Sequence, residues 1–143
     1  MIIIDTNVVS EITRARPSSA VRAWLDSQIR QELFLCAPVL AELRYGIERL
    51  PAGRRRELLD KALNRIVSEG FPDRILPLDR DAAHEFGRIV AHRDRLGRPI
   101  ATMDGMIAAI AIVNRAAIAT RDVEEFSDLG IDVIDPFGAP TTE

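Results

Sequence analysis

Cysteine is nearly absent from this chain, because Cys36 is the only one among its 143 residues. An internal disulfide is therefore impossible. Cys36 lies in the apolar run LFLCAP, which is typical of a strand, and a free cysteine there behaves as a small buried hydrophobic residue. A catalytic thiol is the alternative, but neither His84 nor His92 lies in a recognisable partner motif.

Long apolar runs and histidine clusters are absent as well. No apolar stretch reaches the ~18 residues that would span a membrane, and the short run at residues 2–4 has no basic segment before it, unlike a signal peptide. These absences predict a cytoplasmic protein with no membrane association. His84 and His92 are the only two histidines and form no His/Cys cluster, which argues against a zinc site.

Lysine is almost completely replaced by arginine. Lys61 is the only lysine, so the other 18 of the 19 basic residues are arginines. A guanidinium group matches the geometry of phosphate, but a GC-rich genome would produce the same bias, and both interpretations stay open. The formal charge of −3 argues against non-specific coating of nucleic acid. It is compatible with a nucleic-acid enzyme that has local basic patches.

What the chain does contain is an alternation of short apolar runs and helical patterns, in a composition ordinary for a globular protein. This alternation predicts a single α/β domain with a central parallel sheet of about five strands and helices on both faces. The domain is expected to cover residues 1–137, with a flexible C-terminal tail at 138–143. Strands are expected at 2–4, 33–36, 75–78, 116–119 and 131–134, and helical spacing of apolar residues recurs within 20–25, 39–50, 58–67, 82–90 and 103–113.

The last of these helices, over residues 103–113, is apolar almost all round, and Thr102 is expected to cap it. Such a helix packs between layers of the fold or in a subunit interface. On the second interpretation we predict at least a homodimer, because exposed apolar patches mark interfaces.

Four acidic residues are expected at one edge of this sheet. Asp5 and Asp122 leave the first and fourth predicted strands at their carboxyl ends, where open parallel sheets place their ligands. Glu42 and Asp104 lie near the starts of two helices, which reach the same edge.

Each acid also has a simpler structural explanation. Asp5 could be a turn residue or a helix cap, and Glu42 could be half-exposed and paired with a neighbouring arginine. Asp104 would favour a helix dipole, and Asp122 could cap a following helix. Four carboxylates together, however, repel one another: at ~5 Å and an effective dielectric of ~20, one pair costs roughly 3 kcal/mol. A cation would resolve this repulsion, and ligands that are all oxygen atoms suit Mg²⁺ or Mn²⁺.

Four segments of the chain resemble the successive motifs of the PIN-domain ribonucleases, and most closely the VapC/FitB-type toxins of bacterial toxin–antitoxin pairs. These segments are MIIIDTNVVSE, PVLAELRYGI, ATMDGMIAAIAI and IATRDVEEF. The resemblance implies a PIN-like nuclease domain whose acidic site maps onto Asp5, Glu42, Asp104 and Asp122. Many relatives have asparagine at the position of Asp122. Asn7 and Thr120 match polar positions that support the metal ligands.

The function that this resemblance implies is that of a metal-dependent endoribonuclease. It would hydrolyse RNA phosphodiester bonds with Mg²⁺ or Mn²⁺ and act as the toxin of a type II pair, with a small antitoxin that is a DNA-binding dimer. Asp5 would be the central ligand, and Glu42 and Asp104 would complete the set. Asp122 would bind a second metal or hold a water, and Arg121 would contact substrate phosphate or form an outward ion pair.

Three rival functions fit parts of the same pattern. A haloacid-dehalogenase-type phosphatase needs a second aspartate where this chain has Asn7, and a receiver domain needs a lysine that Lys61 is misplaced to supply. The third is a PIN-like binding module with weak or no catalysis that works through its antitoxin. The four acids favour an enzyme, because a binding module has no need of them.

Overall fold

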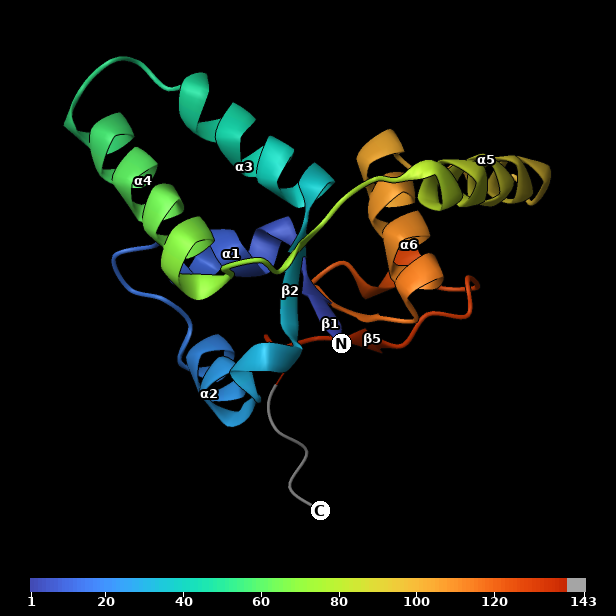
Figure 1. Ribbon diagram of the computed structural model, residues 1–143, viewed down its shortest axis with the longest axis horizontal. Coiled ribbons are helices and arrows are strands. Elements are labelled where there is room, and N and C mark those ends of the chain that lie inside the picture. The colour runs from blue at the N-terminus through green and yellow to red at the C-terminus, as the bar shows by residue number, and fades with distance from the viewer. Residues whose placement is uncertain (139–143) are drawn as a thin grey trace.

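Five short strands form one sheet in the order β3-β2-β1-β4-β5, and every neighbouring pair is parallel. The computed structural model describes residues 1–138, so the rest of the predicted tail, 139–143, lies outside the described residues. The first strand along the chain lies at the centre of the sheet (Figure 1). The strands are β1 (Ile2–Ile4), β2 (Leu33–Cys36), β3 (Ile75–Leu76), β4 (Ala117–Ala119) and β5 (Val133–Ile134).

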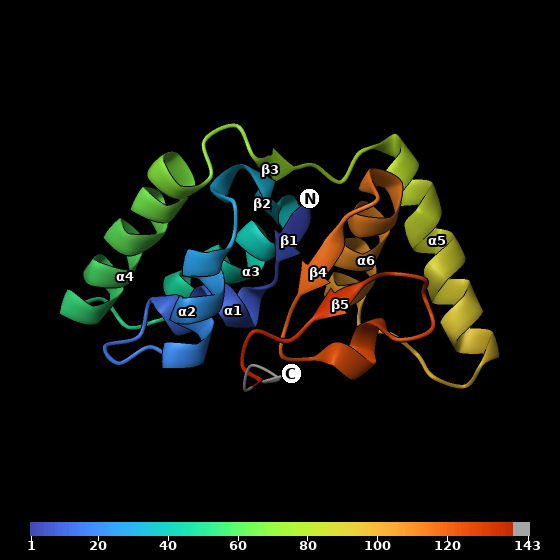
Figure 2. The same ribbon diagram turned by 90° about the horizontal axis from the view of Figure 1, so that it is seen from below.

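Within residues 1–138, six α-helices cover the sheet on both faces, as the alternating pattern predicted. In Figures 1 and 2, α1 to α4 gather on one side of the strands, and α5 with α6 on the other. Short turns η1 (Arg30–Glu32), η2 (Ile66–Gly70) and η3 (Val123–Phe126) complete the fold. The helices are α1 (Thr6–Ile12), α2 (Ser19–Ser27), α3 (Ala37–Glu48), α4 (Arg54–Arg65), α5 (Arg80–Arg95) and α6 (Thr102–Asn114).

The structure corrects the sequence-based elements in three respects. Helix α1 was not predicted, because its sequence TNVVSEI is too short and too rich in β-branched residues to show helical periodicity. Thr102 does not cap α6: the capping position is Ala101, which has extended backbone and no capping side chain, and Thr102 is the first helical residue. Strands β3, β4 and β5 are also shorter than predicted, and β3 ends before Pro77.

Helix α6 is a core helix that lies between the sheet and α5. Gly105, Ile107 and the run Ala108–Ala111 are all buried. A Cβ atom added at Gly105 would lie 3.1 Å from Phe86 on α5, so the two helices pack in close contact there. The apolar surface of α6 is therefore used inside the domain. It no longer supplies a reason to expect a homodimer, which stays a prediction.

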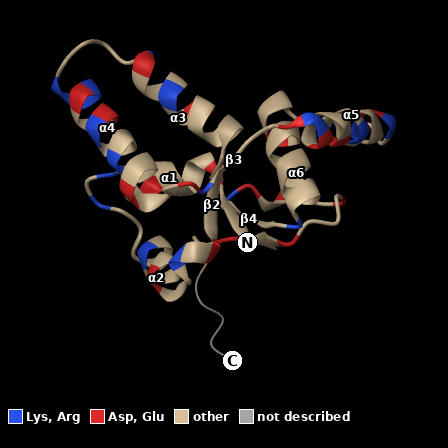
Figure 3. Cartoon of the chain, in the orientation of Figure 1, with Lys and Arg blue, Asp and Glu red and all other residues tan. Residues whose placement is uncertain are grey.

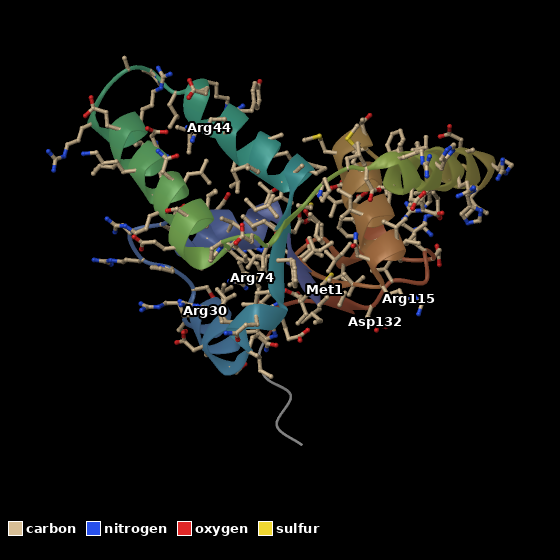
Figure 4. The ribbon with its side chains drawn as sticks, viewed as in Figure 1. Met1, Arg30, Arg44, Arg74, Arg115 and Asp132 are labelled. Atoms are coloured by element: carbon tan, nitrogen blue, oxygen red, sulfur yellow. The ribbon has the colours of Figure 1, made fainter. Side chains whose placement is uncertain are left out.

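Two arginines join elements on the outer layer. Arg44 of α3 bonds Asp60 and Asn64 of α4, and Arg74 donates to the main-chain carbonyls of Arg30, Leu33 and Gly70 (Figure 4). Such pairs contribute little when exposed, but they fix how α4 and the start of β2 lie against their neighbours.

Among the described residues, no helix combines the length and apolar character that crossing a membrane requires.

Candidate active site

Asp5 stands at the carboxyl end of the central strand, and it is only 4% exposed. Its backbone N–H donates to the carbonyl of Ala119 at 3.0 Å, which joins the ends of β1 and β4. One carboxylate oxygen accepts from the N–H of Thr6 at 2.7 Å and so caps α1. The helix-cap interpretation is therefore correct, and the same side chain also faces the predicted site.

The ends of β1 and β4 lie side by side, which is the condition under which the sequence places Asp5 and Asp122 together, and a polar network joins them. The hydroxyl of Thr120, which is fully buried, donates to Asp5 Oδ2 at 2.7 Å. Asn7 Nδ2 lies 3.1 Å from Thr120 Oγ1 and 3.1 Å from Asp122 Oδ2, while Asn7 Oδ1 accepts from the N–H of Arg121. Thr120 and Asn7 thus hold Asp5 and Asp122 in one arrangement.

Glu42 and Asp104 reach the same edge from α3 and α6. Glu42 is half-buried and accepts a hydrogen bond from the hydroxyl of Thr6 at 3.0 Å, not from an arginine. Burial raises the pKa of Glu42, and the nearby charge of Asp5 adds to the rise. Burial also raises the pKa of Asp104 to about 6, with further contributions from the negative charges of Asp5, Glu125, Glu42 and Asp122.

The pKa of Asp5 is raised as well. Burial raises its pKa most, the hydrogen bonds from Thr120 and the Thr6 backbone oppose that rise, and the charge of Asp122 adds to it. The other three acids therefore all lie within electrostatic reach of Asp5. The carboxylates destabilise one another, which is the condition that a bound cation relieves.

Asp122 is exposed and precedes η3, but its carboxylate caps nothing and accepts from Asn7 instead. Two further residues of the site were not predicted. Thr6 holds Glu42, and Glu125 of η3 acts on Asp104 as a nearby negative charge. The pair of glutamates that follows Asp122 closely in the sequence was the available signal for Glu125.

The donor set fits a hard divalent cation, because every candidate ligand is a carboxylate oxygen and no thiolate or imidazole competes. Cys36 is buried and burial raises the pKa of its thiol to about 12, while His84 and His92 are both exposed on α5. Within residues 1–138, no three Asp, Glu, His or Cys side chains are already gathered closely enough to hold an ion. The roles of the four acids as ligands therefore stay a prediction.

A groove of about 1320 Å³ opens beside Asn7 and Glu42, between α1, α3 and α4. We call it the α1–α3–α4 groove. Its floor is apolar and includes Leu43, Ile47, Leu59 and Leu63, and its rim carries the arginines Arg14, Arg49, Arg54, Arg55 and Arg121. Figure 3 shows basic residues on α4 and on the connection from α1 to α2.

Arg121 forms no ion pair with a described carboxylate, so the predicted outward ion pair is not observed. Its guanidinium group instead lies over the ring of Phe137, 3.8 Å from the ring centre. This stacking keeps the charge of Arg121 at the rim of the groove, next to Asp122.

Comparison with known proteins agrees with this geometry. The family model described as PIN domain matches residues 2–131. The VapC ribonuclease Y4jK of Sinorhizobium fredii is 40% identical over 137 residues, which are 96% of this chain and 98% of the relative. Toxin FitB of Neisseria gonorrhoeae is 38% identical over 137 residues, covering 96% and 99%.

A solved structure of FitAB bound to a DNA fragment superimposes with a TM-score of 0.90 at 36% identity, covering 97% of both chains. The fold, the sequence relatives and the family model therefore agree over nearly the whole chain. The protein belongs to the PIN-domain family.

Proposed function

We propose that this protein is a divalent-metal-dependent endoribonuclease, that it acts in the cytoplasm, and that it is the toxin of a type II toxin–antitoxin pair. One observation supports this most. A buried carboxylate, Asp5, stands at the centre of a parallel sheet with three more acids in electrostatic reach, and no basic side chain within residues 1–138 forms an ion pair with any of the four. Such an arrangement costs folding energy, so it fits a protein that uses the acids to bind metal.

Four residues would hold the cation: Asp5, Glu42, Asp104 and Asp122. A bound Mg²⁺ or Mn²⁺ supplies a Lewis acid that acidifies water and offsets the charge of a phosphodiester. Thr120 and Thr6 keep Asp5 and Glu42 oriented by donating to their carboxylates. Asn7 holds Asp122, and through its own carbonyl it also fixes the backbone of Arg121. These hydrogen bonds orient the acids before any ligand binds.

The α1–α3–α4 groove is the proposed path of the RNA strand to the acids. Its arginine rim can neutralise phosphates, and it reaches the site at Asn7 and Glu42. Arg121 is the nearest of these arginines to Asp122 in the chain, so we assign it to the phosphate next to the bond that is cut. A local basic rim also explains how a chain of net charge −3 could bind RNA.

A small antitoxin is the second proposed partner. The relative FitB carries the name toxin, and the FitAB complex of the matching structure is bound to DNA. We infer that this chain likewise forms a complex with a small protein that binds DNA as a dimer. Co-expression with the adjacent reading frame tests this, and a product that neither binds the chain nor relieves its toxicity would contradict it.

The nuclease proposal is tested with purified protein, single-stranded RNA and either Mn²⁺ or EDTA. We expect cleavage in Mn²⁺, loss of cleavage in EDTA, and loss of cleavage in Asp5→Asn with Mn²⁺ present. Undiminished cleavage in excess EDTA would overturn the metal mechanism. No cleavage under any condition, with tight antitoxin binding retained, would favour the alternative of a binding module.

A further inference from the structure

Arg93 is a buried cation that has no anionic partner within residues 1–138. Its side chain is only 2% exposed, although it lies in the last turn of α5. Among residues 1–138, no carboxylate forms an ion pair with it, and its Nε atom has no hydrogen-bond partner. Burial of an arginine without a carboxylate is costly, so its position calls for an explanation beyond packing.

The partners of Arg93 are main-chain carbonyls of the segment that follows Asp122. Its Nη2 atom donates to the carbonyl of Glu125 at 2.5 Å and to that of Ser127 at 2.9 Å. A longer contact of 3.5 Å joins Nη1 to the carbonyl of Arg98, in the loop before α6. One guanidinium group therefore ties α5 to two segments that each adjoin an acid of the site.

The first of these segments is η3, which is short and needs an external anchor. It contains only four residues, Val123–Phe126, and its turn closes by a bond from the N–H of Glu125 to the carbonyl of Asp122 at 3.1 Å. Fixing the Glu125 carbonyl therefore fixes the backbone that starts at Asp122. Phe126, which is 1% exposed, anchors the same turn in the core but does not set the direction of its carbonyls.

The second segment is the connection from α5 to α6, which determines where α6 begins. Arg98 lies three residues before Ala101, the capping position of α6, and Asp104 is in the first turn of that helix. The side chain of Arg98 also bonds Asp128 and the hydroxyl of Ser127, so the same loop contacts the residues that follow η3 a second time.

We propose that Arg93 is a positioning residue for the metal site. It fixes the position of the Asp122–Glu125 turn relative to the start of α6, so that Asp122 and Asp104 face one ion. This inference rests on the proposed function. The contacts of Arg93 are with main-chain carbonyls and not with the four acids, so its role is to position and not to ligate. Its positive charge is held by carbonyl dipoles, so it does not neutralise the carboxylates that must bind the cation.

The test compares Mn²⁺ binding in wild type, Arg93→Met and Arg93→Lys, with free Mn²⁺ followed by electron paramagnetic resonance. Methionine keeps most of the apolar stem and loses every donor. Lysine keeps the charge but cannot bond several carbonyls with a planar fork. We expect the half-saturating Mn²⁺ concentration to rise about tenfold or more in Arg93→Met and by less in Arg93→Lys. The KM for RNA should not change, while kcat at fixed Mn²⁺ should fall.

Two control variants separate positioning from general loss of stability. Arg88→Met makes the same substitution on the same helix at an exposed side chain, and Val21→Ala destabilises the core at α2. Both should bind Mn²⁺ as wild type does at a temperature where circular dichroism shows all variants folded. If Arg93→Met fails to fold, Arg93→Lys carries the comparison.

The results distinguish failure of the proposed function from failure of the inference about Arg93. If wild type binds no Mn²⁺, the proposed function fails. If wild type binds Mn²⁺ and the folded Arg93 variants bind it equally well, the inference about Arg93 is overturned and the function stands. A loss of binding in Val21→Ala as large as that in Arg93→Met would also overturn it.

Discussion

At the scale of single residues, Asp5 performs two tasks that normally belong to different side chains. One oxygen caps α1 through the N–H of Thr6, and the other accepts the hydroxyl of Thr120. Both bonds favour the ionised carboxylate, whereas burial disfavours it and prevails, so the pKa of Asp5 is raised. The fold therefore keeps the Asp5 side chain rigid, and burial makes its ionised form unfavourable when no cation is bound. Both properties suit a central metal ligand.

Asp104 gives the sharpest residue-scale prediction, because two explanations of it predict opposite pH dependence. If Asp104 belongs to a crowded acidic site, its pKa of about 6 in the folded protein exceeds its ordinary value of 3.8. Between these two values the folded state keeps a proton that the unfolded chain has released. The contribution of Asp104 to the free energy of unfolding should therefore fall as the pH rises from about 4 to about 6, and then level off.

The measurement is a set of thermal melts of wild type and Asp104→Asn in EDTA and in Mn²⁺. In EDTA the variant should be at least as stable as wild type, and its advantage should grow between about pH 4 and pH 6. At a pH above this interval, Mn²⁺ should raise the melting temperature of wild type, and it should raise that of the variant much less. If Asp104 only favours the helix dipole, the variant should instead lose about 0.3–1 kcal/mol as the pH rises.

At the scale of elements, Gly105 sets how closely α6 approaches α5. Alanine is better than glycine in a helix by ~1 kcal/mol, but a Cβ here would lie 3.1 Å from Phe86 and 3.4 Å from Val90. Overpacking costs ~1–3 kcal/mol, so we expect Gly105→Ala to lower the free energy of unfolding by about 1 kcal/mol. In a Phe86→Leu background the contact is relieved, and the same change should be neutral or stabilising. Urea unfolding of the four proteins measures this, and an equal loss in both backgrounds would refute it.

The elements differ in how well the sequence predicted them. Periodicity identified α3, α5 and α6, because each has a long apolar stripe or face, and it identified β1 and β2 as short apolar runs. It missed α1, whose helical state depends on the cap from Asp5 and on burial of Val8 and Val9 against the core. It also could not choose between a core and an interface position for α6, since only the packing of α5 settles that.

The sequence likewise predicted only some of the residues that form the site. Asp5 and Asp122 could be predicted because strand ends in a parallel sheet share an edge. The bond from Thr6 to Glu42 and the contacts of Arg93 could not, since they join residues 36 and 32 positions apart in ways that depend on how helices pack. Strand ends and the family resemblance therefore predicted the acids together with Asn7 and Thr120, whereas Thr6 and Arg93 became evident only from the packing of the helices.

At the scale of the whole molecule, the charge distribution makes a prediction about salt. Arg54 and Arg55 line the α1–α3–α4 groove from the first turn of α4. Replacing both with glutamine should raise the KM for RNA and leave kcat nearly unchanged. The slope of log(kcat/KM) against log salt should weaken by about 0.7 for each phosphate that the protein no longer neutralises. The matched control is Arg80→Gln with Arg88→Gln on α5, which removes the same charge and should have no such effect.

Self-association is the second whole-molecule prediction. We predict a homodimer, and light scattering of the isolated chain at micromolar concentration should give twice the mass of 15.9 kDa. Since α6 is covered inside the domain, such a dimer must use another surface. Apolar side chains that remain exposed include Tyr45, Leu58 and Leu96. A single species of 15.9 kDa would contradict the prediction.

The position of β1 at the centre of the sheet has a consequence for biosynthesis. The ribosome makes β1 before the other strands of the sheet, yet one of its two neighbours, β4, follows only after six helices and two other strands. The hydroxyl that orients Asp5 lies 115 residues further along the chain. Pairing across such a separation must wait until the intervening chain is present, and it is slow compared with local folding. A nascent chain that ends before Thr120 therefore carries Asp5 without the hydroxyl that orients it and without Asp122. On the proposed function, such a chain lacks an assembled metal site and should not cleave RNA.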